Sequence, residues 1–280
     1  MTSPTGTSST RAPRGRAGGT GAATDADAEA LAFAGELVAR CGLQARERQA
    51  GVVERTKPGG SLAGTAVTDV DVDLERLVDE ALAQRYPDDA LIGEEGTERP
   101  GTSGRTWVVD PVDGTLNYAR RCGVWSVVLC AWEGETPVLA AVWTDGRLYT
   151  ALRGRGAHLD GERLTLGPEA ERGGIVRTPA ALAPVVDAAG WLTRTVESSA
   201  AEVVAVADGR FTGGVRLRGD RRDLHGPALV AEEAGATVTD LDGGPWSGAS
   251  RGLVLAHPGA HAALLDLVRT AREQRARAKD

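Results

Sequence analysis

The segment from Trp107 to Tyr118, WVVDPVDGTLNY, constrains the fold of this chain more than any other stretch. A short apolar run ends at Asp110, and Pro111 follows it, which is typical of a buried strand whose chain turns at its end. A second carboxylate, Asp113, lies three residues after the first. Two carboxylates that converge across a turn either share a proton or bind a hard cation, and ligand sets made only of oxygen suit Mg²⁺ best.

The next two residues, Gly114 and Thr115, are predicted to open a short helix. Free N–H groups at the start of a helix favour an anion, so a cation site and an anion site would lie side by side. This combination indicates chemistry on a phosphate bridged by a metal ion. The same residue types also populate ordinary turns for local reasons, and a plain turn is the alternative for this motif alone.

The run D-P-V-D-G-T, preceded by Ile92-Gly93-Glu94-Glu95, resembles paired motifs of the inositol monophosphatase family of Mg²⁺-dependent phosphatases. A third stretch, DLHGPALVAEEAG from Asp223 to Gly235, resembles the family's W-D-x-A-A-G helix. The three motifs occur in the family's order, and the resemblance covers roughly residues 25–275. It implies the layered α-β-α-β-α sugar-phosphatase fold, which is an α/β fold, and usually a homodimer.

The resemblance also implies a set of site residues. Two or three Mg²⁺ ions would be held by five groups, namely Glu94, Asp110, the Val112 carbonyl, Asp113 and Asp223. Glu94 and Thr115 would orient the attacking water, and the N–H groups of Gly114 and Thr115 would bind phosphate oxygens. Lys57 occupies a loop position that lies near the site in the family.

The sequence departs from the family pattern at several of these positions. Thr65 stands where the family has an Asp that bonds the motif threonine, which is Thr115 here. Because threonine carries no charge, hydrolysis could be slower or the water could be activated differently. Arg222 replaces a Trp, and Arg216 falls on the acidic residue that holds substrate hydroxyls in the family. His225-Gly226-Pro227 replaces a run of small residues, and Pro227 is expected in the first turn of its helix, where proline is tolerated.

Four arginines near the third motif leave two interpretations open: Arg216, Arg218, Arg221 and Arg222. They form either a solvated surface or a site for a second phosphate or a carboxylate, which arginine recognises with two donors. Asp223 likewise has two interpretations, because an aspartate near a helix start is also a common cap.

Hydrophobic periodicity predicts the elements around these motifs. Helices are expected over residues 25–41, 71–86, 180–189, 198–207 and 261–275, with the third motif starting another at Asp223. Strands are expected within 51–70 and over 90–93, 124–131, 137–143, 147–152, 157–159, 174–177, 210–217, 237–240 and 252–256. We expect a disordered tail over 1–23 and a single catalytic unit made of residues 24–172 and 173–280.

Composition limits the possible binding partners and cellular compartment of the chain. The chain has 280 residues, a formal net charge of −7 and 41% hydrophobic residues, so it can bury a large core and non-specific nucleic-acid binding is not expected. Its three cysteines lack metal-site spacing and fit a reducing cytoplasm. The longest apolar run, Trp125–Trp132, is too short to span a bilayer, and the N-terminus lacks a secretory signal.

These observations lead to one expected function and two alternatives. We expect Mg²⁺-dependent hydrolysis of a small phosphate monoester, such as a sugar or cyclitol phosphate. The departures at Thr65, Arg222 and His225 favour the first alternative, a protein that binds a phosphorylated ligand but has lost efficient chemistry. The second alternative is an enzyme of specialised metabolism that performs a non-hydrolytic step on a phosphorylated intermediate.

Overall fold

The computed structural model describes residues 23–56, 66–167, 174–219 and 221–277. Lys57 and Thr65 of the expected site therefore lie outside the described residues, as do the expected tail up to residue 22 and the expected boundary at residues 172 and 173. The elements and contacts of the fold belong to these described residues.

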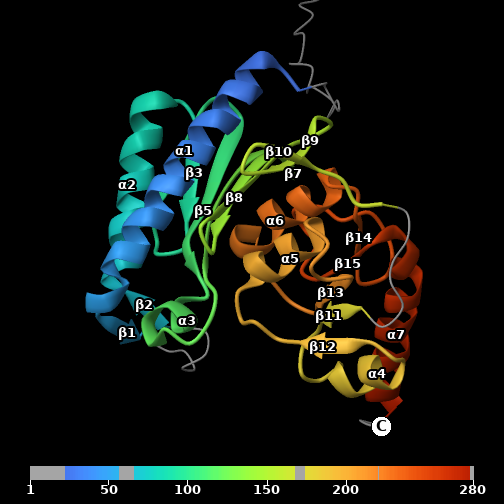
Figure 1. The fold of residues 1–280 in the computed structure, drawn as a ribbon. Coiled ribbons are helices and arrows are strands. Elements are labelled where there is room, and N and C mark those ends of the chain that lie inside the picture. The colour runs from blue at the N-terminus through green and yellow to red at the C-terminus, as the bar shows by residue number, and fades with distance from the viewer. Residues whose placement is uncertain (1–22, 57–65, 168–173, 220, 278–280) are drawn as a thin grey trace, which may run out of the picture.

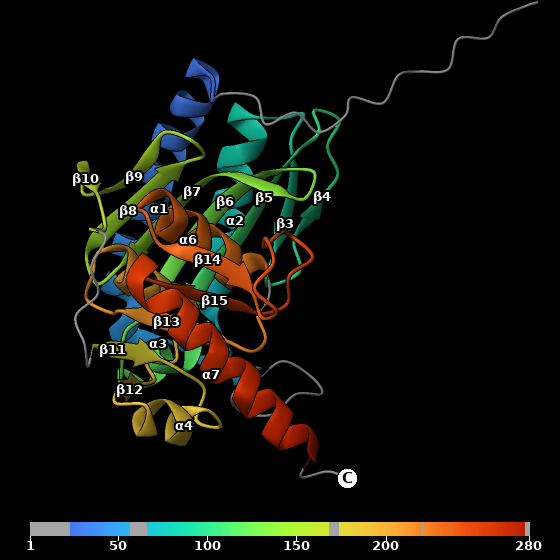
Figure 2. The ribbon, with the colours of Figure 1, turned by 90° about the vertical axis from the view of Figure 1, so that its right-hand side faces the viewer.

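The chain forms five layers, which confirms the expected α-β-α-β-α architecture (Figure 1). Helices α1 (Asp25–Arg48) and α2 (Asp69–Arg85) cover one face of a large sheet. Helices α5 (Ser199–Ala207) and α6 (Arg221–Glu233) fill the space between that sheet and a smaller one. Helices α4 (Ala183–Ala188) and α7 (Pro258–Arg277) form the outer layer, and α7 crosses the smaller sheet in Figure 2.

The large sheet has eight strands. In spatial order they are β10 (Glu162–Leu164), β9 (Gly156–Leu159), β8 (Arg147–Leu152), β7 (Thr136–Thr144), β6 (Ser126–Glu133), β5 (Arg105–Asp113), β3 (Ala90–Gly93) and β4 (Glu98–Arg99). Its one parallel pair is β3 with β5, so the ends of these two strands lie side by side, with Gly93 opposite Val109. The predicted antiparallel meander is confirmed in β6 to β9.

The smaller sheet has five strands. In spatial order they are β12 (Leu192–Arg194), β11 (Ile175–Arg177), β13 (Gly213–Arg216), β15 (Leu253–Ala256) and β14 (Thr237–Asp240). A separate hairpin pairs β1 (Glu54–Thr56) with β2 (Ala66–Thr68), and two short helices complete the set, η1 (Gln49–Gly51) and α3 (Thr115–Arg120).

The first two helices begin where their sequences provide caps. Thr24 and Asp27 form a capping box at the start of α1, and Thr68 and Asp71 form one at the start of α2. Each box satisfies N–H groups that have no partner within the helix. The capping box at Thr68 also fixes the position of a buried carboxylate, Asp71, which becomes important at the site.

The structure corrects several expected boundaries. Helix α1 continues to Arg48, seven residues past the expected end, because it keeps packing on the large sheet through Cys41 and Ala45. Three short strands, β4, β10 and β12, were not expected, since two or three residues carry too little periodicity to predict a strand.

The expectation for Pro227 is wrong. Helix α6 begins at Arg221, so Pro227 lies inside the helix rather than in its first turn. A proline there has no N–H to donate to the carbonyl four residues earlier, which belongs to Asp223. Packing compensates, because residues 224–231 of α6 are all buried between the two sheets.

Candidate active site

Strand β5 carries two of the expected ligands, Asp110 and Asp113, and an irregularity in its pairing with β6 brings them to one side of the sheet. Residues three apart in a regular strand point to opposite faces. In β5 the pairing with β6 shifts between Asp110 and Asp113, because Asp110 lies opposite Val128 and Asp113 lies opposite Ser126. One extra residue is thereby accommodated, as in a β-bulge. The Asp110 Oδ1 atom accepts a hydrogen bond of 3.0 Å from the Val112 N–H within this bulge.

Glu94 follows β3 and meets Asp110 at the end of the neighbouring strand. The two carboxyl groups share a hydrogen bond, which requires a proton on one of them. Burial raises the pKa of Asp110 well above its ordinary value, and the nearby charges of Glu94, Asp113 and Asp223 raise it further. The four acidic side chains expected from the sequence are thus close enough to act on one another electrostatically.

Asp113 is held by the first turn of α5. Its Oδ2 accepts hydrogen bonds from Ser198 Oγ at 2.5 Å and from the Ala200 N–H at 2.8 Å, and its Oδ1 accepts one from the Ser199 N–H at 3.0 Å. Burial and the charge of Asp223 raise the pKa of Asp113 to about 7, although these hydrogen bonds act in the opposite direction. The two halves of the chain therefore meet at this carboxylate.

Helix α6 brings Asp223 to the same place from the second half. Asp223 is the third residue of the helix, and its charge raises the pKa of both Asp110 and Asp113. Arg216 Nη2 of β13 lies 3.9 Å from Asp223 Oδ2. As the side chains stand, no group of three or more acidic, histidine or cysteine residues in the described ranges is arranged to hold a metal ion.

The Gly114–Thr115 turn lies directly after these strands. Gly114 adopts a left-handed conformation with φ 89°, which glycine reaches without strain, and α3 begins at Thr115. The Thr115 hydroxyl lies 3.0 Å from the Val112 carbonyl oxygen and 3.4 Å from Asp71 Oδ1. Asp71 is buried, and burial together with the charges of Glu95 and Glu94 raises its pKa to about 7.

Asp71 lies beside the candidate site, and the sequence predicted no role for it. The expected partner of Thr115 was the residue at position 65, which lies outside the described residues, whereas the structure places the Asp71 carboxylate beside this hydroxyl. The signal was present in the run Val67-Thr68-Asp69-Val70-Asp71, where Thr68 followed three residues later by an acid indicates a helix start.

A second buried acid, Glu75, holds the loop that carries Glu94. Glu75 of α2 accepts hydrogen bonds from the N–H groups of Glu95 at 2.7 Å and Thr97 at 2.8 Å. A side chain at Gly93 would place its Cβ 2.3 Å from the Glu75 carboxyl carbon, so the close approach requires glycine there. Glu75 thereby fixes the backbone that directly follows Glu94.

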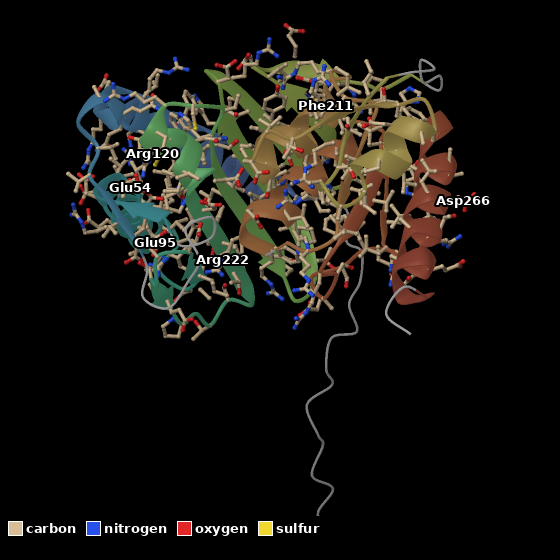
Figure 3. All side chains as sticks on the ribbon, turned by 90° about the horizontal axis from the view of Figure 1, so that it is seen from below. Glu54, Glu95, Arg120, Phe211, Arg222 and Asp266 are labelled. Carbon is tan, nitrogen blue, oxygen red and sulfur yellow. The ribbon has the colours of Figure 1, made fainter. Side chains whose placement is uncertain are left out.

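The arginines of the third motif do not form one cluster. Arg222 donates to the Gly93 carbonyl oxygen at 3.3 Å, which joins the start of α6 to the Glu94 loop, and it lies on the same side of the molecule as Glu95 in Figure 3. Arg221 lies over the Trp132 ring, with its Cζ 5.3 Å from the ring centre. Arg216 instead points to two acids, Glu202 and Asp223.

His225 belongs to the core rather than to the site. It is buried between Trp132 and Trp246, with ring centres 5.4 Å and 5.6 Å away, and its Nε2 lies 3.0 Å from the Ser250 carbonyl oxygen. The exchange of a small residue for histidine therefore fills space between α6 and the large sheet. It is not evidence that the chemistry of the site has changed.

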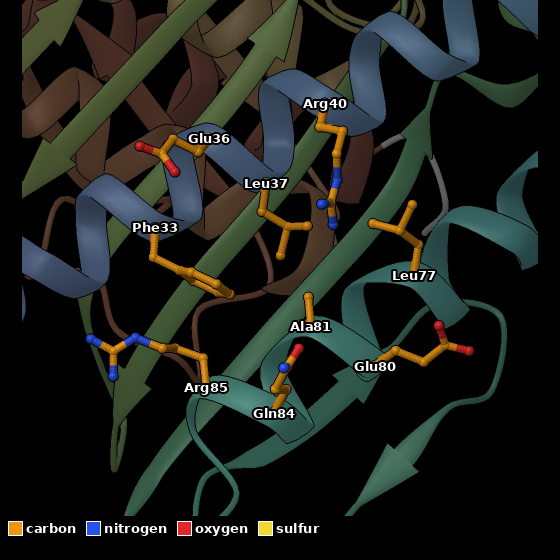
Figure 4. Close-up of a pocket in the computed structure, with 9 residues that line it drawn as sticks. All are labelled: Phe33, Glu36, Leu37, Arg40, Leu77, Glu80, Ala81, Gln84 and Arg85. Carbon is orange, nitrogen blue, oxygen red and sulfur yellow. The ribbon is translucent and has the colours of Figure 1, made fainter.

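A groove of the described surface lies apart from the acids of the site. This groove of about 750 Å³ runs between α1 and α2, with Phe33, Leu37 and Leu77 among its lining residues (Figure 4). It belongs to the helical layer on the far side of the large sheet from α5 and α6. Among the described residues, none of the expected site residues lines it.

Residues 24–274 match the inositol monophosphatase family. The chain belongs to this family. Human inositol monophosphatase 1 is 26% identical over 212 residues, which are 68% of this chain and 76% of the human protein. The histidinol-phosphatase of Chlorobaculum parvum is 36% identical over 110 residues, which are 38% of this chain and 42% of that protein.

Membership in the inositol monophosphatase family also agrees with the fold. The solved structure of the Thermotoga maritima IMPase superimposes with a TM-score of 0.80 at 23% identity, covering 88% of this chain and 99% of that one. The relatives named here are phosphatases, and this chain is a phosphoric monoester hydrolase of their family. No helix within the described ranges combines the length and the apolar character needed to cross a membrane.

Proposed function

We propose that this family member hydrolyses a small phosphate monoester, such as a sugar or cyclitol phosphate, with the help of Mg²⁺. The observation that carries the proposal is the meeting of Glu94, Asp110, Asp113 and Asp223 beside the Gly114–Thr115 turn. Asp110 and Asp113 are buried, and burial and the neighbouring acids raise their pKa values, so the arrangement is unfavourable by itself when these groups are charged. A divalent cation would neutralise it.

The residues present fit a hard cation. Carboxylate and carbonyl oxygens are the ligands that Mg²⁺ prefers, and the site offers four carboxylates and the Val112 carbonyl. In the structure Glu94 and Asp110 are hydrogen-bonded to each other, so their proton would leave and both side chains would turn as the cation binds. We propose that the site binds two or three Mg²⁺ ions. When bound, they would lower the pKa of a water molecule and stabilise charge on the phosphate.

The chain's own groups would orient the attacking water and the substrate. Thr115 lies between Asp71 and the Val112 carbonyl, so its hydroxyl can accept from a water molecule while it donates to one of these oxygens. Asp71, with a pKa near 7, can take the proton through Thr115, and Glu94 borders the same space. The N–H groups of Gly114 and Thr115 would bind phosphate oxygens.

The proposed reaction is the hydrolysis of a phosphate monoester. A water oxygen forms a bond to phosphorus, the bond from phosphorus to the ester oxygen breaks, and a proton passes to that oxygen. The products are an alcohol and inorganic phosphate. Lys57, Thr65 and Arg222 complete the proposed set, with Lys57 and Arg222 near the phosphate and Thr65 near the water.

The experiment is a release assay for inorganic phosphate over a panel of phosphate esters, with Mg²⁺ and with EDTA. We expect Mg²⁺-dependent release from at least one ester, and at least a hundredfold loss for Asp110→Asn. Glu80→Gln, an exposed acid on α2, serves as a matched control with unchanged rate. Absence of turnover for every ester, despite measurable Mg²⁺ binding, would leave the proposal without support and favour a ligand-binding protein.

Two further features belong to the proposal. The three cysteines are unpaired, and two of them are buried, which favours a reducing compartment such as the cytoplasm. The family resemblance favours a homodimer, for which a native mass measurement is the direct test.

A further inference from the structure

A buried cluster of charges lies next to Asp223, made of Arg177, Glu202 and Arg216. Glu202 comes from α5, and the two arginines end the neighbouring strands β11 and β13. Arg177 Nε is in contact with Glu202 Oε2, and Arg216 Nη1 lies 3.3 Å from the same oxygen. The side chains are 7%, 1% and 15% exposed for Arg177, Glu202 and Arg216, so Arg216 is the member that solvent reaches most.

The cluster has more positive than negative charge. Two guanidinium groups share one carboxylate, which leaves a net charge of about +1 at a site where desolvation makes charge costly. The pKa of Arg177 is lowered by burial and then by repulsion from Arg216, which shows that the two cations act on each other. Glu202 cannot offset more of the positive charge, because its other oxygen, Oε1, accepts hydrogen bonds from the N–H groups of Val196 and Glu197.

Two further carboxylates lie near the cluster: Glu197 acts on Arg177, and Asp223, which the proposed function uses as a cation ligand, lies beside Arg216. Arg216 Nη2 lies 3.9 Å from Asp223 Oδ2, on the side of the guanidinium that faces the carboxylates. If Asp223 ligates a cation, the cation compensates the negative charge of Asp223. The Nη2 donors of Arg216 are then available to a group of the substrate. The guanidinium fork is suited to a carboxylate or phosphate group.

We propose that Arg216, held by Glu202 and backed by Arg177, binds a second anionic group of the substrate, so that this enzyme prefers phosphate esters carrying an additional carboxylate or phosphate. This inference rests on the proposed function, since it names the substrate class of the same site. An uncharged polyol offers nothing to offset the excess positive charge, whereas an anion offsets it directly.

The test uses matched pairs of esters that differ by one anionic group. 3-Phosphoglycerate and glycerol 3-phosphate differ by a carboxylate, and fructose 1,6-bisphosphate and fructose 1-phosphate differ by a phosphate. We expect kcat/KM at least tenfold higher for the doubly anionic member of one or both pairs, and the pair that responds identifies the group. A wild-type enzyme that prefers the singly anionic member of both pairs overturns the inference.

Two variants with opposite expected effects separate recognition from folding. Arg216→Met should reduce the preference to within about twofold of unity, through a rise in KM for the doubly anionic ester alone. Glu202→Gln leaves both guanidinium groups without their carboxylate and keeps an oxygen for the Val196 N–H, so the preference should rise severalfold. Arg218→Met, an exposed neighbour, should leave the preference unchanged. Equal losses for both members of a pair would show a purely structural role and overturn the inference.

A binding measurement distinguishes this inference from the proposed function. Calorimetric titration of the protein with 3-phosphoglycerate in Ca²⁺ should give a dissociation constant at least tenfold lower than with glycerol 3-phosphate, and Arg216→Met should remove the difference. If no ester is hydrolysed with Mg²⁺ but this difference is found, the hydrolase proposal fails and the anion subsite stands. If hydrolysis is found but neither binding nor kcat/KM depends on Arg216, the subsite fails alone.

Discussion

The Thr115 hydroxyl lies 3.4 Å from Asp71 Oδ1, although the two residues are 44 positions apart and belong to different helices. Thr115 is the first residue of α3, just after β5, and the capping box of α2 holds Asp71 through Thr68. A threonine hydroxyl paired with a carboxylate can accept a hydrogen bond from water and pass on its proton. The pair therefore links the helix cap to the proposed chemistry.

Asp71→Asn should lower kcat strongly. An amide cannot take a proton, and loss of a general base generally reduces a rate by about 10² to 10⁴. Because Asp71 is expected to act on the water and not to ligate Mg²⁺, the Mg²⁺ concentration for half-maximal activity should change less than about threefold. Phosphate release measured over a Mg²⁺ titration checks both. Asp73→Asn, which removes a half-exposed acid of the same helix, is the control.

Thr65→Asp should leave kcat within about threefold of the wild-type value. The departure at position 65 suggested a decayed site, but Thr115 already has a carboxylate beside it in Asp71. A second acid would therefore not supply a missing group. A gain of tenfold or more in phosphate release would instead support the view that this chain has lost efficient chemistry.

The family resemblance implied the layers, and hydrophobic periodicity predicted most of the helices and strands that build them, because it reports burial. Strands β3 and β14 have the expected bounds, and the meander from β6 to β9 follows the alternation that its turn residues separate. The helix boundaries were less accurate. Arg48 ends α1 only because tertiary packing extends the helix, and Pro227 is tolerated inside α6 by the two sheets around it.

The role of the four acids as a metal site stays a prediction, although Glu94, Asp113 and Asp223 all lie close enough to raise the pKa of Asp110. What holds them comes from distant positions, such as the α5 N–H groups on Asp113 and the Glu75 carboxylate under the Glu94 loop. A single sequence carries no signal for such pairings. The same limit applies to Arg216, whose pairing with Glu202 depends on how α5 packs against β13.

Without metal ions, the protein should lose stability as the pH rises from about 4 to about 7. The pKa values of Asp71 and Asp113 are raised from 3.8 to about 7, mainly by burial. Such groups keep their protons in the folded state over this window while the unfolded chain has lost them. Stability is therefore full below the unfolded pKa and falls as the pH passes through the folded one, by about 1.4 kcal/mol per pH unit for each retained proton.

Thermal unfolding in EDTA checks this expectation. The midpoint should fall by about 5 °C or more between pH 5 and pH 7.5, since about 1 kcal/mol shifts it by several degrees in a chain of this size. Added Mg²⁺ should remove part of the fall at pH 7.5, because the cation replaces the proton of the proposed ligand Asp113. Asp27 and Asp69 have lowered pKa values, so their contributions change only below about pH 4 and do not mask the effect. A midpoint that rises over the same pH range in EDTA would contradict the assignment of these acids.

Glu75→Gln should weaken the apparent Mg²⁺ affinity at least tenfold while kcat at saturating Mg²⁺ recovers to within about threefold. Glu75 binds no substrate in the proposal, and it acts by accepting hydrogen bonds from the N–H groups of Glu95 and Thr97, which directly follow the proposed ligand Glu94. A glutamine offers one oxygen in place of two, so one buried N–H loses its acceptor and the loop loosens. Calorimetric titration with Mg²⁺ gives the affinity without relying on turnover, and Glu80→Gln on the exposed side of α2 is the matched control. A uniform loss of kcat with unchanged Mg²⁺ affinity would mean that Glu75 supports the fold generally and not the position of Glu94.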